Sequence, residues 1–183
     1  MLLGWILARD TKDGPIKLRI VEIEAYHQDD PASHSFRGRT ARTAPMFETG
    51  GRLYVYFTYG MHYAINIVVG REGVGEAVLL RAAEPIEGLE IIQKNRGGIS
   101  NIYNLASGPG KLAQALGIKD TSLSGKILDK SSIYLQQPSE PVKTKDILAS
   151  PRIGIRQAAD VPWRFYIKNS PFVTKHAYNK IDG

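Results

Sequence analysis

Short segments of alternating or continuous apolar positions recur along this chain, which is the pattern of β-strands. It predicts strands over residues 2–8, 16–25, 52–58, 62–69, 76–82, 132–136, 151–155 and 163–167. One helix is predicted from Glu84-Pro85 to about Asn95, and a second from Ser107-Gly108-Pro109 to Gly117. Because strands and helices do not alternate, we expect α+β architecture with a mostly antiparallel, curved sheet and a few packed helices. The length predicts a single domain over residues 1–183.

The segments between these elements differ in kind. Residues 27–51 hold few apolar positions, and such long irregular loops in compact domains are usually functional or disordered. Tyr59-Gly60-Met61 separates two apolar runs, which predicts a protruding β-hairpin with Tyr59 at its tip. The tail after Pro171 is expected to be loosely held.

Charge and composition narrow the function classes. Lys and Arg number 24 against 18 Asp and Glu, a formal net charge of +6, and such a balance favours an anionic partner such as nucleic acid. A basic protein surface without that role remains the alternative. The absence of cysteine excludes disulfides, thiolate metal sites and a cysteine nucleophile.

Targeting and cofactor signals are weak in this sequence. No apolar stretch approaches the length of a membrane span, and the apolar start lacks a basic leader, so we expect a cytoplasmic protein with no secretion signal and no membrane partner. Glycine-rich phosphate loops and metalloprotease or nucleophile-elbow motifs are missing, and the histidines lack metal-ligand spacing. We therefore expect no cofactor and no metal.

The strand ending at residue 26 carries the first candidate chemistry. Glu22, Glu24 and Tyr26 occupy alternate positions, so they share one face, while the other face is apolar. This predicts either a pocket wall or an ordinary amphipathic strand with a solvated acidic face. Ser33-His34-Ser35 follows, where His34 could stack, bond phosphate, act as an acid or base, or be merely structural.

The predicted hairpin carries the second. Tyr54 and Tyr56 share one face, and a tyrosine at the tip could act as a wedge between stacked bases or could pack under its own turn. Asn66 and Arg81 lie in otherwise apolar strands, and buried polar groups need partners. They are expected to be network residues or pocket-lining residues.

Cations in two other segments suit phosphate contacts. The long loop carries Arg37, Arg39 and Arg42, and Lys111 lies in the first turn of the second helix. A solvated basic loop would look the same in the sequence.

Several motifs in order now resemble one family. They are Glu24-Ala25-Tyr26, Ser33-His34-Ser35, the stretch from Leu53 to Met61, Asn66, Leu79-Leu80-Arg81-Ala82 with Glu84-Pro85, Ser107-Gly108-Pro109 with Lys111, Pro151-Arg152-Ile153-Gly154 and Arg164-Phe165-Tyr166. Together they resemble the alkyladenine (3-methyladenine) DNA glycosylase family, the mammalian-type single-domain enzymes, over nearly the whole chain. That family usually has an additional segment before Leu2, and its loop between Tyr26 and His34 is slightly longer.

The resemblance implies residue roles. Glu24 corresponds to a general base that activates water, and Arg81 to a residue that helps hold this water. Tyr26, His34 and Tyr56 correspond to an aromatic pocket around an extruded base. Tyr59 corresponds to a tyrosine that fills the gap left in the duplex. Asn66 corresponds to a pocket-wall amide that screens out guanine-type bases by clashing with their exocyclic amino group.

The implied function is base-excision repair. We expect a monomeric, monofunctional glycosylase that flips alkylated or deaminated purines out of double-stranded DNA and leaves an abasic site. The sequence does not rank 3-methyladenine, 7-methylguanine, hypoxanthine and ethenoadenine as lesions, nor does it give Glu22 a role. The alternatives are a non-catalytic nucleic-acid-binding module, and an RNA-binding or formyltransferase-like β-rich domain.

Overall fold

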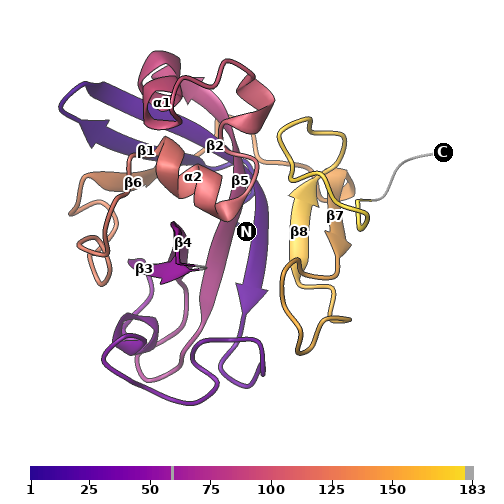
Figure 1. Cartoon of the computed structure of the whole chain (residues 1–183). Helices are drawn as coiled ribbons and strands as arrows, with labels where there is room; N and C mark the ends of the chain where they lie inside the picture. Colours follow the sequence, from indigo (N-terminus) through magenta and orange to yellow (C-terminus); the bar gives the residue numbers. More distant parts are fainter. Residues whose placement is uncertain (59, 180–183) are drawn as a thin grey trace.

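The computed structural model describes residues 1–58 and 60–179. One eight-stranded antiparallel sheet organises them, as the sequence predicted (Figure 1). Its strands are β1 (Ile6–Thr11), β2 (Gly14–Tyr26), β3 (Arg52–Thr58), β4 (His62–Val68), β5 (Ala77–Glu87), β6 (Ile133–Gln136), β7 (Ile147–Ser150) and β8 (Arg164–Ile167). The α-helices are α1 (Leu89–Asn95) and α2 (Pro109–Ala115), and the 3₁₀ helices are η1 (Ala44–Phe47), η2 (Ile102–Asn104) and η3 (Thr144–Asp146). The fold is α+β.

The sheet branches along β2. The strand order is β3-β4-β5-β2-β1-β6, so β5 lies along one edge of β2. On the other edge, the first part of β2 pairs with β1, and Glu22–Glu24 pair with β8, which pairs in turn with β7. Register shifts at this point leave Val21 as an extra residue on β2 and Arg81 as an extra residue on β5. Such bulges bend a strand and redirect side chains, and here they lie on either side of Glu22, just before Glu24.

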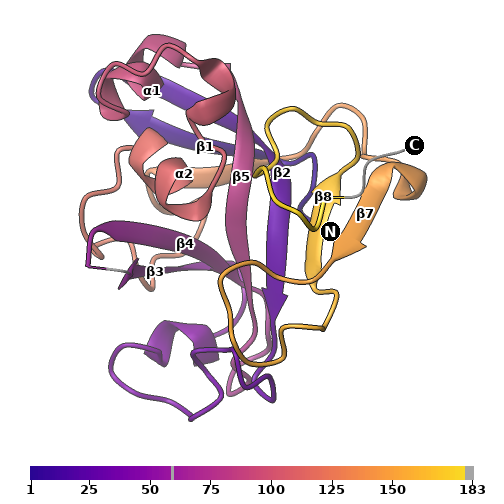
Figure 2. The same ribbon diagram turned by 45° about the vertical axis from the view of Figure 1, so that its right-hand side comes forward.

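Apolar clusters cover both faces of this branch. The main cluster joins the sheet to α1 and α2, which pack on one face (Figure 2). A second cluster packs Met46 and Phe47 of the long loop against Tyr54 of β3. A third joins the bulged Val21 to Tyr166 and Val173, and so fixes the C-terminal segment to the sheet. The helices, the loop and the C-terminal segment therefore all pack against the branched sheet.

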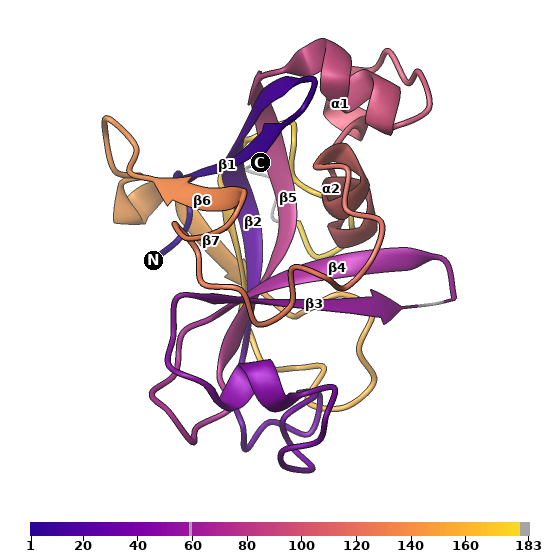
Figure 3. The ribbon, with the colours of Figure 1, turned by 90° about the vertical axis from the view of Figure 1, so that its left-hand side faces the viewer.

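The β3–β4 hairpin extends from the body of the sheet, as predicted (Figure 3). Its far end exposes Phe57 and Met61, while Tyr59 lies outside the described residues. The start of α2 packs against the hairpin at Gly110, where a Cβ atom would lie 2.9 Å from Cγ of His62. Glycine is thus needed for this close approach of helix and hairpin.

The prediction that a helix begins at Glu84-Pro85 was wrong. β5 continues to Glu87, because Glu84 pairs with Arg19 across the strands and β4 does not extend beside Pro85 to require its missing N–H. The chain then turns at Gly88, whose φ is 78°, and the helix begins at Leu89. A Cβ atom at residue 88 would lie 2.4 Å from a backbone carbonyl oxygen of β2, so only glycine fits this turn.

Two predictions near the C-terminus were wrong, and one strand near the N-terminus begins later than predicted. The strand predicted over 151–155 is an irregular segment that follows β7, because the N–H of Ile153 bonds a buried side chain and not a neighbouring strand. The tail is not loosely held up to Asn179, because Thr174 donates its N–H to Glu22. The strand predicted over 2–8 begins later, at Ile6, and pairs through Thr11.

Candidate active site

A cavity of about 380 Å³ lies between β2, β5, the hairpin and the long loop, within the range of small-molecule sites. Its floor comes from the strands, and its walls come from aromatic and apolar side chains. The lining residues are Glu24, Tyr26, Ala32, Ser33, His34, Met46, Tyr54, Tyr56, Thr58, Ala64, Asn66, Leu79, Arg81, Pro109, Ile153, Gly154 and Ile155. The structure thus brings together six predicted site residues: Glu24, Tyr26, His34, Tyr56, Asn66 and Arg81.

Glu24 lies at the floor of this cavity and is fully buried. Its Oε1 accepts the backbone N–H of Ile153 at 2.7 Å, and its Oε2 accepts the hydroxyl of Tyr26 at 2.9 Å. Nη1 of Arg81 lies 3.3 Å from Oε1. A carboxylate oxygen has two lone pairs, so Oε2 keeps one for a further donor. The carboxylate is held in one orientation and can still accept a proton.

Arg81 is shared between the two glutamates of β2. Its Nε donates to Oε1 of Glu22 at 3.1 Å, while Nη1 approaches Glu24. Burial would lower the pKa of Arg81, but the negative charges of Glu24 and Glu22 outweigh it and raise the pKa above its usual value. Arg81 therefore remains a cation at the edge of the cavity.

Glu24 and Arg81 at the floor belong to a balanced set of buried ions, and the other members of this set do not line the cavity. Glu22 is fully buried and also accepts Nε of Arg164 at 2.6 Å. Asp30, in the long loop, forms a bidentate pair with Arg152, whose Nη2 lies 3.1 Å from Oδ1. Three carboxylates thus face three guanidinium groups, which is how buried charges are tolerated. The acidic face of β2 is therefore not a solvated surface: Glu24 and Tyr26 line the cavity, and Glu22 is buried without lining it.

Tyr26 is held from both sides. The guanidinium carbon of Arg152 lies 4.6 Å from the centroid of its ring, and its hydroxyl donates to Glu24. Burial and then the negative charge of Glu24 raise the pKa of Tyr26 well above its usual value. The phenol therefore stays protonated and remains a donor to the carboxylate.

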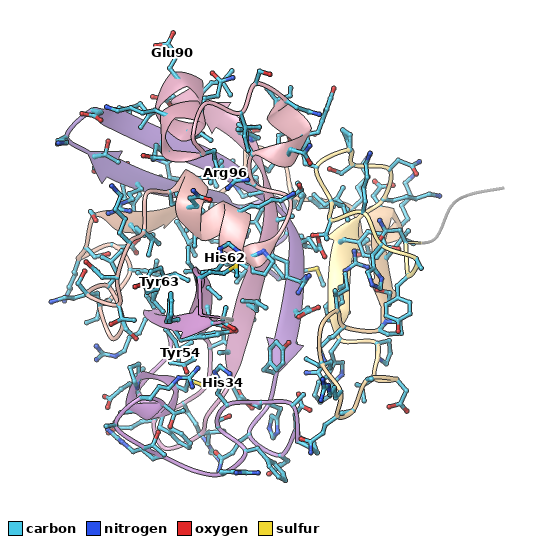
Figure 4. All side chains as sticks on the ribbon, in the orientation of Figure 1. His34, Tyr54, His62, Tyr63, Glu90 and Arg96 are labelled. Carbon is cyan, nitrogen blue, oxygen red and sulfur yellow. The ribbon has the colours of Figure 1, made fainter. Side chains whose placement is uncertain are left out.

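The opposite wall is aromatic. His34 lies edge-on to Tyr56 with ring centroids 4.5 Å apart, and its Nδ1 lies 2.9 Å from the hydroxyl of Tyr54. Figure 4 shows His34 and Tyr54 close together, one from the loop and one from β3. Partial burial and then the charge of Arg42 lower the pKa of His34, so the ring is neutral at neutral pH. An uncharged aromatic wall suits a flat ligand, including a cationic one.

Hydrogen bonds position His34 and Asn66. The hydroxyls of Ser33 and Ser35 lie 2.7 Å apart, and Ser35 donates to the carbonyl of Gly75 at 2.7 Å, which fixes the loop on either side of His34. Asn66 is buried in β4 and donates its Nδ2 to the carbonyl of Tyr54 at 3.1 Å. These contacts fix its amide at the cavity wall.

The predicted phosphate-binding cations do not line the cavity, but they lie on the long loop and on α2, which both contribute lining residues and form its rim. Arg37, Arg39 and Arg42 are exposed. Arg39 pairs with Glu48 at 2.7 Å, and the guanidinium carbon of Arg42 lies 5.4 Å from the ring centroid of Tyr56. Lys111, in α2, has its Nζ 3.5 Å from the hydroxyl of Ser107. Their proposed contact with DNA remains a prediction.

Sequence reasoning missed several supporting residues. No partner was predicted for Arg152, Asp30 or Arg164, and no role for the backbone of Ile153. The only signal in the sequence is that Arg152 and Arg164 have apolar neighbours, which indicates burial but not the partner, whereas Asp30 lies in a polar stretch.

Within residues 1–58 and 60–179, no group of His, Cys, Asp or Glu side chains has the arrangement of a metal site. No helix in this part of the chain is long and apolar enough to span a membrane.

Comparison with known proteins gives the class of this protein. The sequence model of the methylpurine-DNA glycosylase (MPG) family matches residues 1–171, and the chain belongs to this family. Members are DNA glycosylases, hydrolases of base-excision DNA repair, and DNA is the substrate that family membership implies.

Individual relatives agree with this class. A protein of Carboxydothermus hydrogenoformans, named "Putative 3-methyladenine DNA glycosylase", is 48% identical over 95% of this chain and 90% of its own length. Proteins with the same name in Methanoculleus marisnigri (48% identical, 86% of this chain and 82% of the relative) and Streptomyces avermitilis (45% identical, 96% and 84%) are also similar.

Proposed function

We propose that this protein is a monofunctional DNA glycosylase that receives a flipped, alkylated or deaminated purine in the cavity and hydrolyses its N-glycosidic bond. The observation that carries this proposal is the orientation of Glu24, which is buried at the cavity floor and held by Ile153, Tyr26 and Arg81. The names of the relatives, which refer to 3-methyladenine, support a damaged purine as the base.

The proposed reaction uses one water molecule. Its oxygen bonds to C1′ of the deoxyribose while the bond from C1′ to the base nitrogen breaks, and the base leaves with the bonding electrons. Glu24 takes the proton of the water, at the lone pair that Oε2 keeps beside the hydroxyl of Tyr26. Arg81 stands 3.3 Å from Oε1 and helps to hold the water. The product is an abasic site.

Base binding uses the aromatic walls. The base must leave the duplex stack, which costs a few kcal/mol. Stacking between Tyr26, His34 and Tyr56 offsets part of this cost, and a cationic alkylpurine gains roughly 0.5–2 kcal/mol from each electron-rich ring. Asn66 at the wall is proposed to exclude guanine-type bases by a clash with their exocyclic amino group. Tyr59 is proposed to fill the gap in the stack.

DNA backbone contacts are assigned to Arg37, Arg39, Arg42 and Lys111 around the rim. We propose a monomer that acts on double-stranded DNA, because the cavity is formed within one chain. The cavity lining in the described part of the chain includes no lysine, which supports hydrolysis without a Schiff base and without strand cleavage.

The decisive experiment is base release from alkylated duplex DNA by the wild type, Glu24→Gln and Glu90→Gln. Glu90 projects from α1 away from the cavity and is the matched control (Figure 4). We expect Glu24→Gln to lose about 10²–10⁴-fold of the excision rate while it still binds DNA, because only the base function is removed. Glu90→Gln should match the wild type.

The outcomes separate the competing functions. DNA binding without base release by the wild type would indicate a non-catalytic binding module. Preference for RNA would indicate an RNA-binding domain. Release by Glu24→Gln at the wild-type rate would refute Glu24 as the base.

A further inference from the structure

Glu22 is a buried carboxylate that the proposed reaction does not use. Its Oε1 accepts Nε of Arg81 at 3.1 Å and Nε of Arg164 at 2.6 Å, and its Oε2 accepts the backbone N–H of Thr174 at 2.8 Å. Removing such a group from water is costly, and an apolar residue of similar size would often be as stable. Its position directly behind Arg81 therefore needs a reason.

The geometry of Arg81 provides that reason. A guanidinium group is planar, and its donors have fixed relative directions. Because Nε is fixed on Glu22, Nη1 is directed to Glu24 at 3.3 Å and to the carbonyl of Ile153 at 3.5 Å. Without Glu22, Arg81 would be free to rotate into a bidentate pair with Glu24, which would hold that carboxylate more strongly and weaken it as a base.

The C-terminal segment completes the arrangement. Nη2 of Arg164 donates to Oδ1 of Asn179 at 2.8 Å, and Nδ2 of Asn179 donates to the carbonyl of Thr174 at 3.0 Å. The same Thr174 gives its N–H to Glu22. Thr174 and Asn179 lie beyond residue 171, where the match to the family model ends. This part of the chain thus contacts the carboxylate that directs Arg81.

We propose that the segment from Thr174 to Asn179 acts with Glu22 and Arg164 as a positioning element for Arg81. The segment fixes Glu22, Glu22 fixes Nε of Arg81, and Arg81 thereby approaches Glu24 with Nη1. None of the segment's residues lines the cavity. The link to catalysis rests on the function proposed above, whereas the hydrogen-bond linkage does not.

Two substitutions at one position test the element. Thr174→Pro removes the N–H that Glu22 accepts, whereas Thr174→Ala keeps it and removes only a hydroxyl that has no hydrogen-bond partner. Asn179→Ala removes the hydrogen bonds of the side-chain amide with Arg164 and with the carbonyl of Thr174. This variant tests the same linkage if Thr174→Pro does not fold.

The kinetic measurement separates chemistry from binding. We expect Thr174→Pro and Asn179→Ala to lower the single-turnover excision rate about tenfold, in keeping with the loss of one hydrogen bond in a buried charged network. Affinity for duplex DNA should stay within about twofold, because the rim is unchanged. Thr174→Ala should match the wild type. Wild-type rates in both Thr174→Pro and Asn179→Ala, or equal losses in Thr174→Ala, would overturn the proposal.

An arginine-selective NMR measurement does not depend on activity. The Nε–H signal of Arg81, assigned by its absence in Arg81→Lys, should exchange slowly in the wild type and in Thr174→Ala. It should shift and exchange faster in Thr174→Pro and Asn179→Ala. An unchanged signal in both would overturn the linkage. If the wild type releases no base, the proposed function fails, while this signal still decides whether the segment positions Arg81.

Discussion

The floor of the cavity, taken with the buried ions that support it, and the rim both carry arginines, but in opposite states. Arg81, Arg152 and Arg164 are buried and paired with carboxylates, whereas Arg37 and Arg42 are exposed to solvent. Charges removed from water interact strongly and hold one geometry, while exposed charges are screened and can exchange partners. The floor should therefore control folding and the chemical step, and the rim should control affinity for DNA and its salt dependence.

Arg152→Met should have the largest effect on stability, because it disrupts the buried ion pair with Asp30. This change leaves Asp30 buried without its bidentate partner, which costs about 3–5 kcal/mol of unfolding free energy. Chemical denaturation with the wild type alongside measures it. The double variant Asp30→Asn with Arg152→Met should recover part of the loss, because no charge is left alone. A loss below about 1 kcal/mol would mean that the floor is no more sensitive than the rim.

Tyr26→Phe tests the chemistry of the floor without breaking an ion pair. The variant keeps the ring under Arg152 and removes only the hydroxyl that bonds Oε2 of Glu24. A hydrogen bond to a buried charge is worth about 1.5–3 kcal/mol, so single-turnover excision should fall about tenfold or more. The melting temperature serves as a control for folding. Full activity in this variant would show that Glu24 does not depend on the hydroxyl for its orientation.

Two arginines of the rim sharpen the contrast. Arg37→Gln should weaken binding to all DNA sequences and reduce the slope of log K against log salt by about 1, if Arg37 contacts a phosphate. Arg39→Gln should have a smaller effect, because Arg39 already pairs with Glu48. Binding titrations at several salt concentrations measure both. Loss of excision rate at saturating enzyme in either variant would contradict the assignment of the rim to binding.

The smallest expected effect is on the pH dependence of stability and concerns His34, which lines the cavity and lies near Arg42 of the rim. Partial burial and then the charge of Arg42 lower its pKa from 6.5 in the folded protein. At mildly acidic pH the unfolded chain therefore binds more protons at this residue than the folded protein does. The stability of the wild type should therefore decline as the pH falls below 6.5, and His34→Gln should lack this part of the decline. Denaturation of both proteins between neutral and mildly acidic pH measures the difference. Parallel curves would refute the prediction.

Local pattern was sufficient for much of this molecule. The hairpin, the strand ending at Tyr26 and the helix after Gly108 follow from apolar alternation and turn residues. The six side chains that the resemblance implied for the catalytic centre and base pocket all line one cavity, while their roles remain predictions. These features depend on neighbours in the sequence or on an ordered set of motifs.

The remaining features depend on distant partners. The ion pairs of Arg152 with Asp30 and of Arg164 with Glu22 join residues 122 and 142 positions apart, and the bond from Thr174 to Glu22 spans 152. The bulges at Val21 and Arg81 depend on strand register, which alternation alone does not reveal. The helix predicted at Glu84-Pro85 failed for a similar reason, because cross-strand pairing extended β5 past a proline that suits a helix start.

The branching of the sheet at β2 also determines at what stage of synthesis the active site can be completed. Glu22 and Glu24 enter early in synthesis, but β8 and Thr174 come near the end of the chain. Until these late segments dock, two carboxylates have no complete set of partners, and contacts of such large sequence separation form slowly. Chains folding during translation should therefore gain base-release activity only after the segment up to Thr174 has left the ribosome, in one late step.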